Sequence, residues 1–223
     1  IAEGIEIRVE ASLNLSFARL GPETARVFCK LAAFPADFDA SAEEVICEDE
    51  GHKHLSELVR RSLALFDAEK KRYHLHDLTR LFADARLRET PEARAAAEKR
   101  HAAHYANVIG TANQLYLKGG DSIMRGLGLF DSERVNIEAG QAWAAANTEA
   151  DNDAATACNR YAGQGSLLNL RLHARENIHW LEAALIAVRR IKNREAEGRH
   201  LGNLGLAYAS LGETRKAIEY HEQ

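Results

Sequence analysis

Apolar residues recur every three to four positions along most of the chain, which is the spacing of an amphipathic helix. Between Pro22 and Pro35 the pattern is carried by Ala25, Phe28 and Leu31. Proline is well tolerated at the first helical position, and the residue before a proline avoids helical backbone angles. The sequence therefore predicts a helix that begins at the first of these prolines and ends just before the second.

Two shorter helices are predicted next. Ser41 and Glu44 have the spacing of a capping box, and we expect the helix that they open to bury Val45 and Ile46. A third helix is expected from about 51 to 62. Its inward-facing residues are Leu55, Leu58 and Val59.

The next segment changes from helical to β-prone spacing. Residues 63–66 and 72–75 are predicted as two strands joined by the polar turn 67–71, and another helix follows. That helix is marked by Leu78, Leu81, Phe82 and Ala85. Three helices followed by a β-hairpin form a winged helix-turn-helix. We predict one such domain over residues 11–89, preceded by a linker at 1–10.

The C-terminal part, residues 151–223, contains an internal repeat. Its last unit reproduces the tetratricopeptide pattern with Leu201, Leu204, Gly205, Tyr208, Gly212, Ala217, Ile218 and Tyr220. The predicted helix pairs are 153–170 with 174–191, and 195–210 with 213–223. We expect Gly205 to allow a close approach of two helices, and Gly212 to allow a turn. Residues 90–150 are predicted as a helical linker that begins at Thr90-Pro91-Glu92. The predicted fold class is therefore mainly α, with a small β-hairpin and stacked helical hairpins.

One face of the helix at 195–210 is a candidate surface for binding a peptide or protein partner. It carries Arg199, Asn203, Leu206 and Ser210. In tetratricopeptide proteins this face is concave, and an asparagine amide can both donate to and accept from a peptide backbone. An ordinary solvated helix face explains the same residues equally well, since one repeat makes no groove.

Composition and charge restrict the function classes that fit this sequence. Lys and Arg number 29 and Asp and Glu number 33, so the formal net charge is −4, which argues against a protein built mainly to hold nucleic acid. No apolar run reaches the ~20 residues of a membrane span. The three cysteines lie far apart, which favours a reducing, cytoplasmic location. The chain begins without methionine, and we interpret it as a piece of a longer protein.

A winged helix raises the possibility of DNA binding. Lys53, Arg60 and Arg61 on the third helix, and the basic residues of the turn, could contact phosphates. Acidic residues lie at or beside the same helix and would repel them: Glu48, Asp49, Glu50 and Glu57. A DNA-binding transcriptional regulator with a repeat sensor is therefore the alternative function, and DNA binding is the less favoured one.

About eighty residues of the segment 11–89 resemble the winged-helix domain of bacterial NB-ARC proteins, the nucleotide-switch ATPases of the STAND class. The resemblance is carried by Ser16-Phe17, Leu20, Phe28, Leu31-Ala32, Phe34-Pro35-Ala36-Asp37-Phe38, Leu58-Val59-Arg60-Arg61-Ser62-Leu63, Arg72-Tyr73-His74-Leu75-His76-Asp77-Leu78 and Phe82-Ala83. Its most specific part is Leu75-His76-Asp77-Leu78, which matches the Met-His-Asp motif with leucine in place of methionine. The stretch from Leu129 to Ile137 resembles the segment that links the winged helix to repeats in such regulators.

The resemblance implies a nucleotide-sensing role for His76 in the full-length protein, where it would contact the β-phosphate of bound ADP. Asp77 is expected to cap the helix that follows. The family's cofactor is ADP or ATP with magnesium, but these residues contain no phosphate-binding loop of the GxxxxGK[ST] type. We therefore expect no cofactor and no catalysis in this piece, and a nucleotide-binding domain of the same protein as one partner.

Other chemistry is not supported by the spacing of reactive residues. His101 and His104 are three positions apart on a predicted helix, and His74 and His76 alternate on a strand, but neither pair has a third metal ligand nearby. The predicted function is thus a non-catalytic, regulatory and protein-interaction piece of a STAND switch. Its final helix presents Ile218, and we expect this apolar face to cause either self-association or fraying of the helix end.

Overall fold

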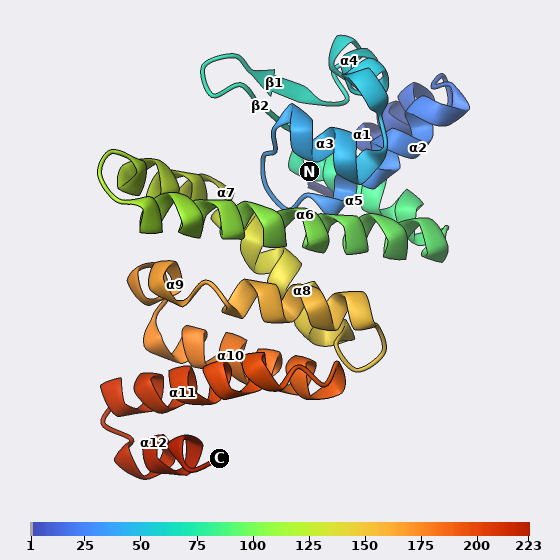
Figure 1. The fold of residues 1–223 in the computed structure, drawn as a ribbon. Coiled ribbons are helices and arrows are strands. Elements are labelled where there is room, and N and C mark those ends of the chain that lie inside the picture. The colour runs from blue at the N-terminus through green and yellow to red at the C-terminus, as the bar shows by residue number, and fades with distance from the viewer. Residues whose placement is uncertain (1) are drawn as a thin grey trace. The chain divides into compact units, whose positions relative to one another are not determined.

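The computed structural model describes residues 2–223, with side chains from residue 10 onward. It is mainly helical, with one antiparallel pair of strands among the residues described (Figure 1). The chain forms two compact units, one ending at His101 and the other beginning at Ala102. This division falls inside helix α6 (Pro91–Lys118), whereas the predicted borders followed residues 89 and 150.

The first unit opens with helix α1 (Ala2–Phe17), so most of the segment 1–10 that we predicted as a linker is helical. Apolar and polar residues alternate irregularly along that sequence, and periodicity alone therefore gave no sign of a helix. The helix predicted between the two prolines is confirmed as α2 (Pro22–Lys30) and a short 3₁₀ turn, η1 (Leu31–Ala33).

Helix α3 (Ala40–Cys47) is capped differently from the prediction. The side chain of Asp39 accepts a hydrogen bond from the backbone N–H of Ala42 at 2.8 Å, so the capping box expected at Ser41 is wrong. Ile46 is buried as expected, but Val45 is 49% exposed.

Asp49 is a second correction. We counted it among the acidic residues that repel DNA, but only 2% of it is exposed. Its carboxylate accepts from the backbone N–H groups of His54 and Leu55, at 2.9 and 2.8 Å. It therefore satisfies the open N–H groups of helix α4 (Lys53–Arg60), which follows the 3₁₀ turn η2 (Glu50–His52).

The predicted hairpin is present as β1 (Leu65–Asp67) and β2 (Arg72–His74). Both strands are shorter than predicted. Outside the hairpin, Phe38 forms an isolated antiparallel bridge to Tyr73, and its ring stacks on Phe34 with centroids 4.1 Å apart. These aromatic side chains join the loop before α3 to the second strand.

The helix after the hairpin is α5 (Asp77–Arg88). Ala83 and Leu87 are buried on its inner face, while Leu81, which helped to predict the helix, is 57% exposed.

The part of α6 that belongs to the second unit forms a hairpin with α7 (Ser122–Asn147). Gly119 and Gly120 make the turn between them at φ angles of 78° and 56°, which side chains rarely adopt. Close packing follows at Gly126, where an added Cβ would lie 2.5 Å from the carbonyl oxygen of Ala112. The two helix backbones therefore approach closely at this glycine.

The rest of the second unit is a succession of helices (Figure 1). They are α8 (Asn152–Ala162), α9 (Gly165–Arg171), α10 (Ala174–Arg190), α11 (Arg194–Ser210) and α12 (Thr214–His221). Helix α10 packs on both α8 and α11, and α11 packs on α12. The single helix predicted over 153–170 is wrong, because the chain turns at Gly163 and Gln164 between α8 and α9.

Of the two glycine predictions for the last repeat, only the one for Gly212 is confirmed. A Cβ at Gly205 would meet the imidazole of His221 on α12, so this glycine leaves room for a side chain and does not show a close approach of the two helix backbones. Gly212 has φ of 76° and makes the turn between α11 and α12. Leu204 is fully buried and Tyr208 is 7% exposed, as expected for the inner face of α11.

Candidate functional site

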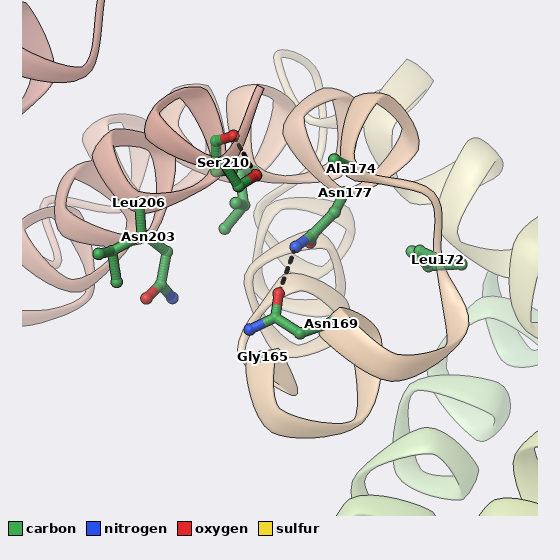
Figure 2. A pocket seen from close by; sticks show the side chains of 10 residues that line it. Gly165, Asn169, Leu172, Ala174, Asn177, Asn203, Leu206 and Ser210 are labelled. Atoms are coloured by element: carbon green, nitrogen blue, oxygen red, sulfur yellow. Dashed lines mark hydrogen bonds between the residues drawn. The ribbon is translucent and has the colours of Figure 1, made fainter. Parts of the chain in front are cut away.

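A groove lies between α9, α10 and α11, entirely within the second unit (Figure 2). Its volume is about 260 Å³. The residues that line it are Gly165, Asn169, Leu172, Ala174, Asn177, Leu181, Asn203, Leu206, Ala207 and Ser210. We call it the amide groove, because three asparagine side chains provide most of its polar atoms.

Two of the amides belong to α9 and α10 and bind each other. The Nδ2 of Asn177 donates to the Oδ1 of Asn169 at 2.8 Å, as the dashed line in Figure 2 shows. Asn177 is only 6% exposed, and its own Oδ1 has no hydrogen-bond partner among the residues described. A buried carbonyl oxygen without a donor is costly, so a ligand N–H that reached it would gain a hydrogen bond at little desolvation cost.

The third amide, that of Asn203 on α11, lies on the other side of the groove. A Cβ added at Gly165 would lie 3.7 Å from its Nδ2, so the glycine keeps this side of the groove open. Ser210 closes the end of the groove, where its hydroxyl donates to the carbonyl oxygen of Ala207 at 2.7 Å.

Leucines provide the apolar part of the lining. Leu172 and Leu181 are buried at 8% and 2% exposure, whereas Leu206 is 65% exposed. All the described lining residues are uncharged. The groove thus offers donors, acceptors and apolar surface to a ligand without selecting for ligand charge.

The structure brings together three of the four residues proposed from the sequence. Asn203, Leu206 and Ser210 line the amide groove, while Arg199 is exposed but does not line it. Sequence reasoning missed Asn169 and Asn177, because it placed the first of them inside a continuous helix. The signal that could have found them is Gly163-Gln164-Gly165, a pair of glycines that favours a break.

The proposed nucleotide sensor lies in the first unit, where β2 leads into α5. His76 is exposed and is the N-cap residue of α5, with φ of −61° and ψ of 146°, but its side chain makes no capping hydrogen bond. Asp77 is the first residue of the helix, so its predicted role as the cap is wrong. The position of the imidazole at a helix start agrees with the sequence, and the sensing role stays a prediction.

A buried acid in the first unit was not singled out from the sequence. Glu43 on α3 is fully buried and lies 3.0 Å from the Nδ1 of His52. Burial raises the pKa of Glu43 to about 7, and the hydrogen bond to this carboxylate raises the pKa of His52. The stability of the first unit therefore depends on the protonation of Glu43 and His52.

The described histidines and cysteines were also compared with the requirements of a metal site and of a reactive thiol. No group of three His, Cys, Asp or Glu side chains among residues 10–223, where side chains are described, could hold a metal ion. His101 is buried with its ring edge-on to Phe34. Burial raises the pKa of the thiols of Cys29 and Cys158 to about 11, which keeps both protonated at neutral pH.

The helices give no sign of a membrane segment. Within residues 2–223, none combines the length and the apolar character that crossing a bilayer requires.

No family model matches the chain, and no curated protein matches it. Among solved structures, the chain is similar to a Signal Transduction ATPase with Numerous Domains (STAND) protein with a tetratricopeptide repeat sensor from Pyrococcus horikoshii. The TM-score is 0.29 and the sequence identity is 15%. The match covers 92% of this chain and 44% of the other, so the chain spans less than half the length of that protein.

Proposed function

We propose that the chain is a non-catalytic, regulatory and protein-interaction piece of a STAND-class switch, and that the amide groove binds an extended peptide segment of a partner. The observation that carries the proposal is the set of amides around an uncharged groove. A peptide backbone presents donors and acceptors in alternation, and an asparagine side chain offers both. The unpartnered Oδ1 of Asn177 accepts from a backbone N–H of that segment.

The helix pairs of the second unit support a tetratricopeptide-like arrangement. Helix α8 packs on α10 and α11 packs on α12, with the turn at Gly212 that the repeat requires. In this proposal α11 presents Asn203 and Leu206 on the partner-binding face. The winged-helix role of residues 11–89 is proposed in the same way, from α2, α3, α4 and the hairpin in that order.

Peptide binding is tested with a displayed library of random peptides, followed by affinity measurements on the selected sequences. Asn203→Ala removes a donor and an acceptor that together contribute about 1–3 kcal/mol, so we expect affinity to fall roughly tenfold. Asn107→Ala is the matched control, since Asn107 is exposed on α6 outside the groove. Equal affinities of the two variants would contradict the proposal, and so would the absence of any selected peptide.

The proposed nucleotide sensor needs the full-length protein. His76→Ala removes a hydrogen bond to the β-phosphate of ADP, which contributes about 1.5–3 kcal/mol when one partner is charged. Such a loss is enough to shift a resting equilibrium strongly towards the active state. We expect faster ADP release and a higher unstimulated signal. His74→Ala is the control, because His74 is also exposed but lies within β2. ADP retention unchanged by His76→Ala would leave His76 with a structural role only.

A further inference from the structure

The second unit contains another groove, between α7 and α10, which shares no lining residue with the amide groove. Its volume is about 690 Å³. We call it the acidic groove. The residues used below are Glu138, Gln141, Ala142, Ala145 and Ala146 on α7, and Glu176, Trp180, Glu182 and Ala183 on α10.

Small side chains form the wall on α7. Ala142, Ala145 and Ala146 follow one another at helical spacing and line the groove, and Ala183 lines it from α10. Alanines on a helix face let another helix backbone approach closely. The indole of Trp180 adds apolar surface, and this residue is only 4% exposed. The shape and lining suit an α-helix with a narrow apolar face.

The groove contains one buried donor without an acceptor among the described residues. Gln141 is 4% exposed, and its Nε2 has no hydrogen-bond partner among the described residues. A buried amide group in this state loses its hydration without compensation. An acceptor on a bound segment, such as a serine hydroxyl, would remove that cost.

The charge at the groove is negative. Glu138, Glu176 and Glu182 line it, and the described lining includes no lysine or arginine. Arg134 compensates part of this charge, since its guanidinium lies 2.6 Å from Glu138 and 3.8 Å from Glu176. Three carboxylates against one guanidinium leave an excess of negative charge. Glu182 has a hydrogen bond from the hydroxyl of Tyr208, at 2.8 Å, and Lys216 on α12 is near enough to interact with its charge.

We propose that the acidic groove is a docking site for a basic amphipathic helix of a partner protein. The narrow apolar face of that helix packs on the alanines and Trp180, and its lysines or arginines face Glu176 and Glu182. A hydroxyl or amide in the apolar face accepts from the Nε2 of Gln141. This site is independent of peptide binding in the amide groove.

The test uses two synthetic helix-forming peptides and the whole 223-residue chain. The first peptide has a face of alanine, leucine and serine flanked by lysines, and the second has glutamates in place of the lysines. Fluorescence anisotropy of labelled peptide measures binding at low and at high salt. We expect binding of the lysine peptide alone, weakened by salt, because the attraction is partly exposed and therefore screened.

Variants locate the binding. Ala146→Phe fills the groove from an exposed position, and we expect at least a tenfold loss of affinity; Ala103→Phe, exposed on α6 outside the groove, is the matched control. Glu182→Gln is expected to weaken binding about two- to fivefold, as for a partly exposed charge pair. Asn203→Ala, in the amide groove, should leave binding unchanged.

Three results would overturn the proposal. The first is equal binding of the lysine and glutamate peptides, and the second is binding of neither. The third is a dimer of the chain that Ala146→Phe dissociates in analytical ultracentrifugation, since the groove would then be occupied by a second copy. Circular dichroism of each variant verifies that the helices are retained, so that a loss of binding is not a loss of folding.

Discussion

Gly126 on α7 offers a direct test of how closely α6 and α7 pack. A Cβ at this position would lie 2.5 Å from the carbonyl oxygen of Ala112 and 2.7 Å from the backbone nitrogen of Tyr116. Both atoms belong to the backbone of α6, so they cannot move aside by a side-chain rotation. Gly128, two residues further along the same helix, has no neighbour within 4 Å of an added Cβ. Gly128→Ala is therefore the matched control for Gly126→Ala.

The expected free energies follow from two opposing effects. Replacing a glycine inside a helix by alanine stabilises the fold by about 1 kcal/mol at either position. At Gly128 this is the whole effect. At Gly126 the overpacking costs typically 1–3 kcal/mol, and contact with backbone rather than side chains places it at the upper end. We expect Gly126→Ala to destabilise the protein by about 1–2 kcal/mol, and thus to be about 2–3 kcal/mol less stable than Gly128→Ala.

Urea unfolding followed by circular dichroism measures this difference, with equal m-values as the condition for comparing the two variants. For a chain of this length, 1 kcal/mol corresponds to about 2–4 °C in Tm. If Gly126→Ala is as stable as Gly128→Ala, the close approach of α6 and α7 is wrong.

Three further predictions concern charge, nucleic acid and association. Because the pKa values of Glu43 and His52 are both raised in the folded state, the contribution of this pair to stability is greatest at low pH and is lost as pH rises from about 4.5 through 7. Burial lowers the pKa of His200 to about 4, which changes stability in the opposite direction, so the pair is tested by comparing two proteins at each pH. Between pH 5 and pH 7.5 the free energy of unfolding of the wild type should fall by about 2 kcal/mol relative to that of Glu43→Gln, and a difference that does not change with pH would contradict the assignment. Anisotropy at about 0.15 M salt should detect no sequence-dependent binding of duplex DNA, despite Lys53 and Arg60 on α4, whereas a nanomolar site would favour the transcriptional regulator. Ile218 on α12 is 52% exposed, and we expect Ile218→Lys to reduce the concentration-dependent association that sedimentation velocity measures. A wild-type chain that stays monomeric at its highest soluble concentration would refute association through this helix.

Periodicity predicted the helices whose apolar residues share one face. The helix between Pro22 and Pro35 and the helix at 195–210 are examples, and both are observed close to the expected bounds. Periodicity failed where a helix has no clear apolar face in its sequence, or where an apolar residue at helical spacing is exposed. Residues 2–10 are helical without a clear apolar face, and Val45 and Leu81 are exposed although they fit a helical spacing.

Capping residues were harder to predict because the choice depends on tertiary geometry. Asp39 and Ser41 are both good N-cap residues by type. Asp39 is the N-cap because its backbone is extended, with φ of −91° and ψ of 170°. Asp49 precedes α4 by several residues, and only the turn at η2 brings its carboxylate to the open N–H groups. The sequence alone does not predict this turn. Asp49, a buried capping residue, was therefore interpreted as a surface charge.

The candidate site shows the same limit. One helix face suggested Asn203, Leu206 and Ser210, since residues on one face are fixed by helical spacing. Asn169 and Asn177 come from two other helices, and their meeting depends on the break between α8 and α9. Contacts between elements that are distant in the sequence require the tertiary fold.

Ionic strength separates the two grooves of the second unit in a single experiment. The described lining of the amide groove is uncharged, so affinity there arises from hydrogen bonds and leucine contacts, which salt screens little. The acidic groove attracts its ligand partly through Glu176 and Glu182, and the Debye length falls from about 10 Å at 0.1 M salt to about 3 Å at 1 M. A partner that loses affinity steeply over this range engages the acidic groove. One whose affinity is constant, and which Asn203→Ala weakens, engages the amide groove.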